Sequence, residues 1–342
     1  MIEKNDRILI TGATGFLGSY VVRYLLKKRF TNIICLKRPN SRIDLLSDIE
    51  EKLEFVEGDV LDIVFLEELL QNIDALIHTA AMVSFRKKDK KRMLQTNIEG
   101  TSNLVNICLN KKIKKFIHIS SIAALGRSEN GKTINEKNEW ENSKYNSDYA
   151  ISKYLSELEV WRGFAEGLNV TIINPSMIIG AGFWKMGTSE FFNQIDNGLS
   201  FYTSGSNGFV DVRDVAKMSV QLLENDITGE RFICSSENIK YRQFFENIAY
   251  ELGKSAPKYV FPNFLTGITG FFLNIINFVL GGKSNLSSQS LKNANFTSLY
   301  DNEKSLKILN FNYTPIKETL KETSALFLKS KEEKSDFNFF KI

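Results

Sequence analysis

The first half of the chain alternates short apolar runs with longer amphipathic stretches. The apolar runs are rich in β-branched residues and show no polar alternation, which is typical of strands buried on both faces. Strands are predicted at 7–10, 32–36, 53–56, 75–78, 116–119 and 170–173, and helices at 16–28, 66–70, 90–110 and 147–164. Strands alternating with helices predict an α/β fold of the Rossmann type, with a doubly wound parallel sheet.

The alternation weakens after Pro175, where glycine and aromatic residues become frequent. A short strand is expected at 210–212 and a helix at 214–225, and a strand at 232–234 is expected to return to the main sheet. We therefore predict a dinucleotide-binding domain at 1–176, with a return segment at about 210–235. A smaller, mostly helical C-terminal substrate lobe is expected at 177–209 plus 236–330, followed by a charged, frayed tail at 331–342.

Composition narrows the class of protein. The 342 residues are 43% hydrophobic, which is enough for a sizeable core. A net charge of +4 is too weak to indicate a nucleic-acid partner. The strongest charge run, 86–92, has no interleaved aromatic residue, so we interpret it as a solvated loop and helix start.

Cysteine and histidine usage argues against disulfides and metal sites. The three cysteines are far apart and form no C-x-x-C pair, which suits a reducing, cytoplasmic location. His78 and His118 each end an apolar run and are expected to be core residues. No signal peptide is recognised, and 264–280 is too short and polar for a membrane span. That segment is expected to be a buried or pocket-lining helix, with membrane-surface contact as the alternative.

A glycine-rich turn follows the first predicted strand and opens a helix. Its sequence, 11–18, is Thr-Gly-Ala-Thr-Gly-Phe-Leu-Gly. Glycines at this spacing permit a tight turn, a close approach to a pyrophosphate and close helix–strand packing. A phosphate-binding P-loop is excluded because Ser19, not lysine, follows Gly18. The turn predicts dinucleotide binding at the helix N-terminus.

The end of the second strand distinguishes NADP from NAD. Lys37 and Arg38 stand there, and 32–41 contains no acidic residue. A cation accommodates the 2′-phosphate of NADP, whereas a carboxylate binds the 2′-hydroxyl of NAD. NADP(H) is therefore favoured, with NAD(H) as the alternative. Asp59, after the third strand, could accept a hydrogen bond from the adenine amino group.

Tyr149 and Lys153 lie four residues apart near a helix start, so both point to one face. A nearby ammonium would lower the tyrosine pKa and make it a usable acid/base. Ser120 and Ser121 end the fifth strand, at the sheet edge where Rossmann folds bind ligands.

These motifs, in this order, resemble the extended short-chain dehydrogenase/reductase family, also called the NAD-dependent epimerase/dehydratase family. The resemblance covers about 7–216 and rests on 11–18, 58–60, 78–81, 96–101, 120–121, 149–153, 174–176 and 210–216. It implies that Tyr149 is the general acid/base and that Lys153 lowers its pKa and binds the nicotinamide ribose.

The resemblance also implies roles for other residues. Ser121, five residues before Gly126, would polarise the substrate oxygen, and Asn97 would order the supporting helix. The cofactor would be bound by Gly12, Thr14, Gly15, Phe16, Leu17, Gly18, Lys37, Arg38, Asp59, Val60, Ala80, Ala81, Tyr149, Lys153, Pro175 and Ser176. The substrate would be bound by Ser84, Ser121 and Asn174.

Within the family, Lys37-Arg38-Pro39 and 120–126 are most similar to the dihydroflavonol-reductase and 3β-hydroxysteroid-dehydrogenase-like branch. This implies a carbonyl–alcohol interconversion by hydride transfer with NADP(H). The alternative is a nucleotide-sugar epimerase or dehydratase with tightly bound NAD; Asn174 favours it, but Met177-Ile178-Ile179-Gly180 lacks the usual Tyr–Gly pair. A non-catalytic NADP sensor is a third hypothesis.

The expected partner is a small molecule, and aromatic residues at 183–202 suggest an apolar one, although core packing explains them equally well. A homodimer through the helices near 90–110 and 147–165 is also expected from the resemblance.

Overall fold

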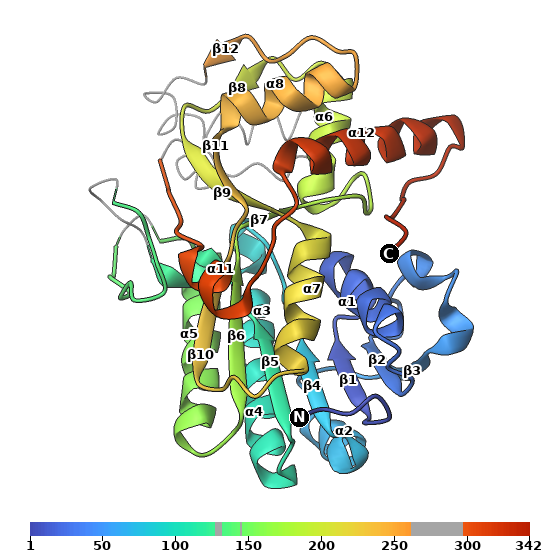
Figure 1. Ribbon diagram of the computed structural model, residues 1–342, viewed down its shortest axis with the longest axis vertical. Helices are drawn as coiled ribbons and strands as arrows, with labels where there is room; N and C mark the ends of the chain where they lie inside the picture. The colour runs from blue at the N-terminus through green and yellow to red at the C-terminus, as the bar shows by residue number, and fades with distance from the viewer. Residues whose placement is uncertain (127–131, 144–145, 261–296) are drawn as a thin grey trace.

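The computed structural model describes residues 1–126, 132–143, 146–260 and 297–342. Its centre is a seven-stranded sheet with the order β10-β6-β5-β4-β1-β2-β3, and every neighbouring pair is parallel (Figure 1). The strands are β1 (Ile8–Thr11), β2 (Ile33–Lys37), β3 (Glu54–Glu57), β4 (Ala75–His78), β5 (Lys115–Ile119), β6 (Val170–Pro175) and β10 (Glu230–Cys234). The order reverses between β1 and β4, and this reversal is the topological switch point of a Rossmann sheet. The predicted doubly wound parallel sheet is therefore confirmed.

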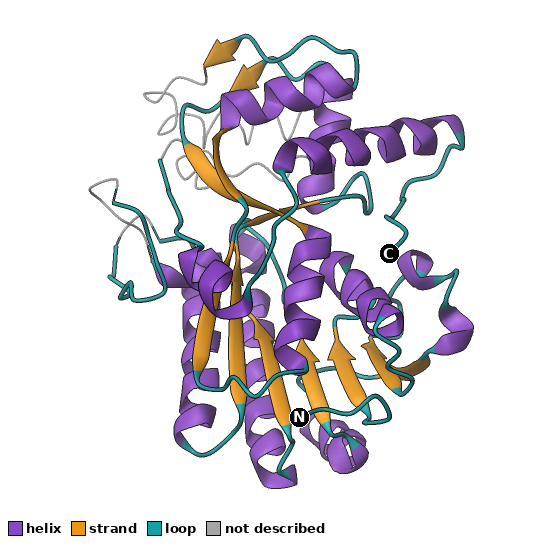
Figure 2. Cartoon of the chain, viewed as in Figure 1, coloured by secondary structure: helices purple, strands orange, loops and turns teal. Residues whose placement is uncertain are grey.

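Helices cover both faces of this sheet (Figure 2). Ile8 and Ile10 contribute to a core cluster with α1 (Phe16–Lys27) and α7 (Val212–Leu223). Leu9, which points the opposite way, belongs to a second cluster. That cluster contains residues of α2 (Ile63–Leu69), α4 (Gly100–Lys111) and α5 (Asp148–Ala165). Burial on both faces explains why the strands are continuously apolar.

The helix predicted at 90–110 is divided into three parts. It consists of α3 (Lys90–Leu94), a π-helical segment (Gln95–Glu99) and α4. A Cβ at Gly100 would lie 2.6 Å from a methyl carbon of Val60, so the helix passes close to the loop after β3. Such π segments occur frequently at functional sites, and this one carries Asn97.

The second lobe contains a small sheet that the sequence did not predict as a unit. Its strands are β7 (Met177–Ile179), β9 (Ser206–Asp211) and β11 (Glu237–Lys240), in the order β11-β9-β7. A further two-stranded pair consists of β8 (Phe201–Tyr202) and β12 (Tyr259–Val260). The lobe's helices are α6 (Glu190–Asp196), α8 (Tyr241–Glu251) and α12 (Ile316–Glu332), whereas α11 (Glu303–Leu309) packs against β10 of the main sheet (Figure 1).

Aromatic residues fill the interior of this lobe. Trp184 and Phe192 are buried, and both rings contact Phe327 of α12. Phe191 makes edge contacts with Phe244 and Phe245 of α8. Core packing therefore accounts for these residues of the aromatic-rich stretch.

The tail at 331–342 is not frayed, so this prediction was wrong. Phe340 is buried, and its backbone N–H donates to the Tyr20 hydroxyl over 3.0 Å. The Arg23 guanidinium lies 3.8 Å from the centroid of the Phe339 ring. The charged start of the tail is followed by three aromatic residues, which supply enough apolar surface to dock it.

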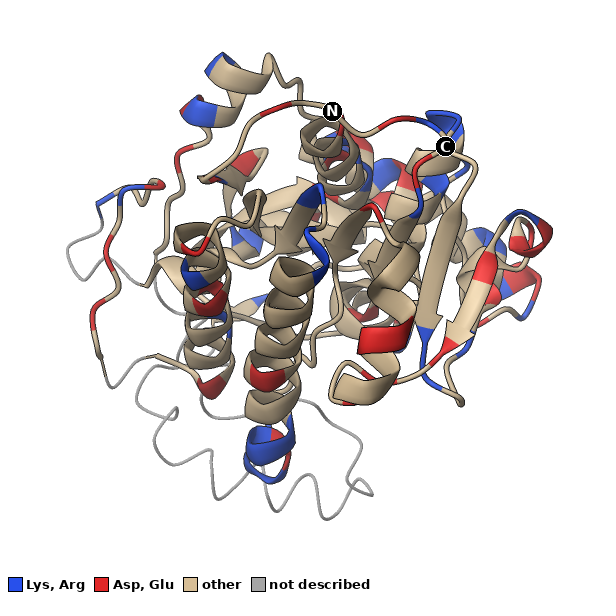
Figure 3. Cartoon of the chain, turned by 90° about the horizontal axis from the view of Figure 1, so that it is seen from below, with Lys and Arg blue, Asp and Glu red and all other residues tan. Residues whose placement is uncertain are grey.

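Charged residues and the lengths of the apolar helices bear on possible partners of the protein. Lys and Arg residues are interspersed with Asp and Glu residues in the view from below (Figure 3). Within the described ranges, no helix is both long and apolar enough to cross a membrane. The segment 264–280 lies outside the described residues.

Candidate active site

The glycine turn between β1 and α1 leaves no room for a side chain at Gly12 or Gly18. Gly12 has φ +70°, and a Cβ there would lie 2.8 Å from the backbone of Ala80. A Cβ at Gly18 would lie 2.1 Å from the Gly12 carbonyl oxygen. The turn is closed by a 3.0 Å hydrogen bond from the Gly15 N–H to the same oxygen. The backbone of the turn, including Thr14, can therefore approach a ligand as closely as a pyrophosphate requires.

The N-terminus of α1 is open to an anion. Gly15 caps the helix without a side-chain hydrogen bond, and no acidic residue occurs in the first turn. The first N–H groups of a helix lack internal partners and carry the positive end of the dipole. Phe16 and Leu17 are half-buried beside them. These features fit a dinucleotide pyrophosphate.

Cations at the end of β2 differ in their partners. Lys37 forms an ion pair with Glu57 at the end of the neighbouring strand. Arg42 is bound to both Asp44 and Asp336. Arg38 is exposed, and within the part of the chain that the structure describes its guanidinium has no ion pair. Arg38 is therefore the cation at this strand end that is available to a 2′-phosphate.

Two residues after β3 face different surroundings. Asp59 is exposed, and its carboxylate accepts a 3.1 Å hydrogen bond from the Leu61 N–H. Val60 is buried, where it packs against Gly100. Asp59 thus keeps acceptor capacity at the sheet edge, whereas Val60 contributes packing.

A buried hydrogen-bond chain joins the glycine turn to the π segment. The Thr101 hydroxyl donates to the Asn97 carbonyl over 2.6 Å, so it accepts from Nε2 of His78 at 3.0 Å. Nδ1 of His78 then accepts from the Thr11 hydroxyl at 2.7 Å. Burial lowers the pKa of His78 to about 3, which keeps the ring neutral. His78 is a core residue, as predicted.

Asn97 holds the loop after β4. Its amide oxygen accepts from the Met82 N–H over 2.7 Å, and its amide nitrogen donates to the Met82 carbonyl and the Ser152 hydroxyl. The loop presents Ala80, half-buried, and Ala81, exposed. Ser84, predicted to bind substrate, donates to Asp89 over 2.7 Å within the loop. Asn97 therefore couples the loop after β4 to α5.

The two serines after β5 have different surroundings. Ser120 is 5% exposed and donates to the carboxylate of Glu157 over 2.5 Å. Ser121 is half-buried, caps the short 3₁₀ helix Ile122–Leu125, and lies near enough to Tyr149 for its side chain to lower the pKa of that tyrosine. The structure therefore brings Ser121, not Ser120, to Tyr149.

Tyr149 and Lys153 lie on α5 with Asn97 and Ser121 around them. Burial raises the pKa of Tyr149, and the neighbouring Ser121 side chain acts in the opposite direction. Lys153 is 3% exposed and donates to the Ile119 carbonyl over 2.8 Å. Burial lowers the pKa of Lys153 to about 8. The sequence predicted that Lys153 would lower the tyrosine pKa; in this structure burial raises that pKa, and the opposing effect comes from Ser121.

The residues at the end of β6 lie deeper than expected. Asn174 is fully buried, and its amide nitrogen donates to the Ser121 carbonyl over 3.0 Å and to Glu157 over 2.8 Å. Both of its donor hydrogens are used inside the protein, whereas its buried amide oxygen has no hydrogen-bond partner among the described residues, so direct contact with substrate stays a prediction. Pro175 and Ser176 are also buried, and the Ser176 N–H donates to the Cys234 carbonyl.

Sequence reasoning missed Glu157 and Arg231. Glu157 is 2% exposed and pairs with Arg231 of β10 over 3.0 Å. The available signal was spacing, because Tyr149, Lys153 and Glu157 repeat at four-residue intervals on one helix face. Arg231 gave no such signal, since it reaches α5 from a strand 74 positions away.

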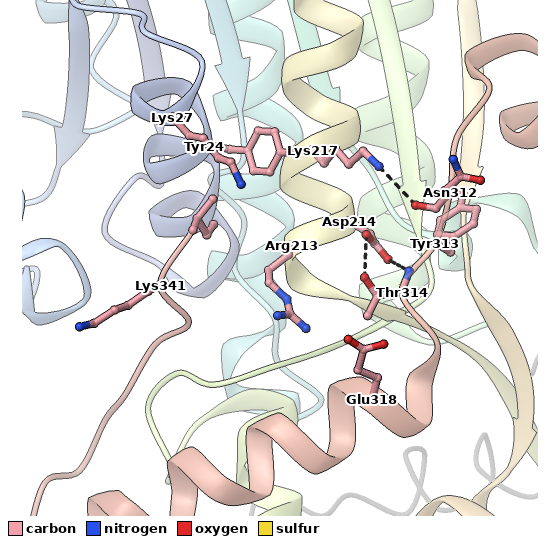
Figure 4. A pocket seen from close by; sticks show the side chains of 11 residues that line it. Tyr24, Lys27, Arg213, Asp214, Lys217, Asn312, Tyr313, Thr314, Glu318 and Lys341 are labelled. Carbon is pink, nitrogen blue, oxygen red and sulfur yellow. Dashed lines mark hydrogen bonds between the residues drawn. The ribbon is translucent and has the colours of Figure 1, made fainter.

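The motif at 210–216 connects the two lobes. Asp211 accepts hydrogen bonds from Arg213 and from Thr319 of α12, and Asp214 accepts from the Thr314 N–H over 2.7 Å. Burial raises the pKa of Asp214 to about 6. Arg213, Asp214 and Thr314 line a pocket of about 340 Å³ between α1, α7 and the segment leading to α12 (Figure 4). No cluster of metal-ligating side chains occurs among the residues with described positions.

Known proteins resemble this chain over almost its whole length. The chain is 28% identical over 327 residues to a putative dihydroflavonol 4-reductase of Synechocystis, covering 93% of this chain and 94% of that protein. The solved structure of gox2253 is 27% identical, with a TM-score of 0.81 and coverage of 95% and 98%.

A second solved structure, the dTDP-glucose 4,6-dehydratase DesIV of Streptomyces venezuelae with NAD and TYD bound, has a TM-score of 0.78. It is 19% identical, covers 96% of this chain and 98% of that one, and shows the fold alone. Residues 8–234 match the family described as NAD dependent epimerase/dehydratase, from the strand before the glycine turn to the end of β10. The protein therefore belongs to the NAD dependent epimerase/dehydratase family of NAD(P)-dependent oxidoreductases.

Proposed function

We propose that the protein is an NADP(H)-dependent oxidoreductase that interconverts a carbonyl and an alcohol. The observation that carries this proposal is the convergence of Ser121, Tyr149 and Lys153 at the carboxyl edge of the sheet. Asn97 links this group to the loop after β4, which packs against the glycine turn. The reductase relative supports the same reaction class.

Each residue has a distinct task in this proposal. A bound nicotinamide cofactor supplies or accepts the hydride. Tyr149 donates its phenolic proton to the substrate oxygen during reduction, and its raised pKa keeps that proton in place at neutral pH. Ser121 donates a hydrogen bond to the same oxygen, and Lys153 binds the nicotinamide ribose. Because the pKa of Lys153 is about 8, its ammonium form should be lost, and reduction should slow, as pH rises above that value.

The preference for NADP(H) is proposed to rest on Arg38. Lys37, the other candidate, is already paired with Glu57. Arg38→Ala should weaken NADPH binding by about 10-fold while changing NADH binding by less than about twofold. Lys37→Ala is the matched control and should change NADPH binding much less. Equal weakening of both cofactors by Arg38→Ala would contradict the assignment.

Substrate selection is proposed to lie in the lobe formed by 177–209 and 236–330, outside the dinucleotide-binding domain at 1–176. A small, apolar carbonyl compound is the expected class, in keeping with the reductase relative. A homodimer through α4 and α5 stays a prediction of the family resemblance.

The test of the proposal is NADPH oxidation in the presence of a panel of aromatic and aliphatic ketones and aldehydes. Tyr149→Phe should reduce turnover by about 1,000-fold without changing the fold. Tyr154→Phe is the matched control, since this tyrosine lies on the same helix and stacks on Trp140 instead. Net NADPH oxidation that persists in Tyr149→Phe would contradict the assigned chemistry.

Two other results would favour the alternatives. NAD that co-purifies and is recycled without net oxidation would favour a nucleotide-sugar epimerase or dehydratase. A biological effect that survives Tyr149→Phe, without turnover by either protein, would favour an NADP sensor.

A further inference from the structure

Glu157 is a buried carboxylate that accepts four hydrogen bonds. One oxygen accepts from the Ser120 hydroxyl at 2.5 Å and from the Asn174 amide at 2.8 Å. The other accepts from Arg231 at 3.0 Å and from the Trp161 indole at 3.3 Å. The side chain is 2% exposed, so these donors replace water almost completely.

Arg231 balances the charge of Glu157 and connects it to a further segment. Its remaining guanidinium nitrogens donate to the Glu136 carbonyl over 2.8 Å and to the Asn138 carbonyl over 2.9 Å. A buried ion pair of this kind is a weak source of stability, because desolvation offsets most of the attraction. Its arrangement in space is therefore the more informative property.

The donors to Glu157 flank the proposed site. Ser120 precedes Ser121 directly, and Asn174 uses its second hydrogen to bind the Ser121 carbonyl over 3.0 Å. Lys153 lies one helical turn before Glu157, and its ammonium group donates to the Ile119 carbonyl at 2.8 Å. One carboxylate thus contacts the ends of β5 and β6 and lies beneath the residues on α5.

We propose that Glu157, held by Arg231, is a positioning residue: its carboxylate fixes Ser120 and Asn174 so that Ser121 and Lys153 keep the geometry that hydride transfer requires. This inference deepens the proposed function and rests on it. Glu157 acts through these neighbours and does not itself contact the reacting atoms.

The charge of Glu157 also acts on Lys153. The titratable groups whose charge is coupled to that of Lys153 are His78 on β4, His118 on β5 and Glu157 on α5 itself; Arg231 of β10 pairs with Glu157. Burial lowers the pKa of both histidines, so they are neutral. Glu157 carries the negative charge that favours the ammonium form of Lys153.

The substitution Glu157→Gln tests both effects. An amide offers one acceptor oxygen, so its NH₂ group must face donors that the carboxylate accepted. Turnover should fall by about 10-fold or more while KM changes by less than about threefold. The basic limb of the pH–rate profile should move to lower pH, because loss of the negative charge lowers the pKa of Lys153.

Glu159→Gln is the matched control. Glu159 lies on the same helix but binds Ser102 and Arg162 nearer the surface, so turnover and pH profile should not change. A folded Glu157→Gln protein with wild-type turnover would overturn the proposal. So would a loss of turnover without any shift of the pH profile, because a purely structural role predicts that result.

Two further measurements keep the inference separate from the proposed function. If the wild-type protein turns over no carbonyl compound, the proposed function fails. The inference is then tested by measuring the pKa of Lys153 by NMR on lysine-labelled protein. The signal of Lys153 is assigned by its absence in the Lys153→Met variant. A lower pKa of Lys153 in Glu157→Gln supports the inference, and an unchanged pKa overturns it.

If Glu157→Gln does not fold, Ser120→Ala should still lower turnover by about threefold or more with KM unchanged. Wild-type turnover by Ser120→Ala would then overturn the proposal.

Discussion

The two ends of the proposed active site are built by different means. At the glycine turn, the backbone itself forms the surface, and Gly12 and Gly18 have no space for a side chain. At the ends of β5 and β6, buried polar side chains set the geometry through Glu157, Asn174 and Arg231. The comparison teaches that local backbone shape determines the first region, whereas contacts between distant residues determine the second.

The largest effect is expected at the glycine turn. Gly18→Ala would place a Cβ 2.1 Å from the Gly12 carbonyl oxygen, so the turn must open. NADPH binding should weaken by about 100-fold or more, measured by fluorescence titration.

Gly187→Ala is the control from the second lobe. Gly187 has φ +59° with open space around it, so alanine should cost about 1 kcal/mol of stability and leave cofactor binding intact. Unchanged NADPH binding by Gly18→Ala would remove the glycine turn from the site.

The next largest effect is expected for the docked chain end, which lies on the side of the glycine turn. Phe340 packs against Tyr20 of α1 and below the Arg213 guanidinium. Phe340→Ala should lower the free energy of unfolding by about 3 kcal/mol, measured by urea denaturation. Lys341→Ala, which removes an exposed side chain, should change it by less than about 0.5 kcal/mol. Equal stability of both variants would show that the tail does not dock in solution.

A smaller effect is expected at the contact between the lobes. Asp214 has a pKa of about 6 in the folded protein against 3.8 as its ordinary value. The folded state therefore binds the proton more tightly, and stability should fall as pH rises from about 4 to about 6. The difference amounts to roughly 2 kcal/mol and should disappear in Asp214→Asn, which keeps the bond from Thr314. Asp226→Asn, at an exposed position, should retain the wild-type pH dependence.

The smallest expected effect concerns the link between the two ends. Asn97→Ala leaves both backbone groups of Met82 without their partners and frees the loop after β4. The ratio kcat/KM should fall by about 10-fold, with cofactor affinity and turnover both affected. Asn103→Ala is the control: Asn103 lies on the same helical stretch and binds the Val60 carbonyl instead. An unchanged kcat/KM would show that Asn97 does not couple the two ends.

The central sheet and the glycine turn could be predicted because the sequence patterns that indicate them are local. Buried parallel strands are continuously apolar, and the glycines follow the first strand directly, so residues 8–18 carry the information themselves. Ser121, Tyr149 and Lys153 could be placed for a related reason: strand ends share one sheet edge, and four-residue spacing shares one helix face.

Residues that act through distant contacts could not be predicted. Asn174 and Ser121 are 53 positions apart, and only the paired strands reveal that the asparagine lies beneath the serine. The docked tail depends on Tyr20, 320 positions before Phe340. Neither contact leaves a periodic signal in the sequence.

Transfer of deuterium tests the central claim most directly. The protein is mixed with NADPH that carries deuterium at both C4 positions of the nicotinamide ring, because only one of the two C4 hydrogens is transferred, and with a carbonyl compound found in the panel above. The account predicts deuterium on the carbinol carbon of the product, in a yield that matches the NADPH oxidised, and none with Tyr149→Phe. Product that forms without deuterium would contradict hydride transfer from NADPH at this site.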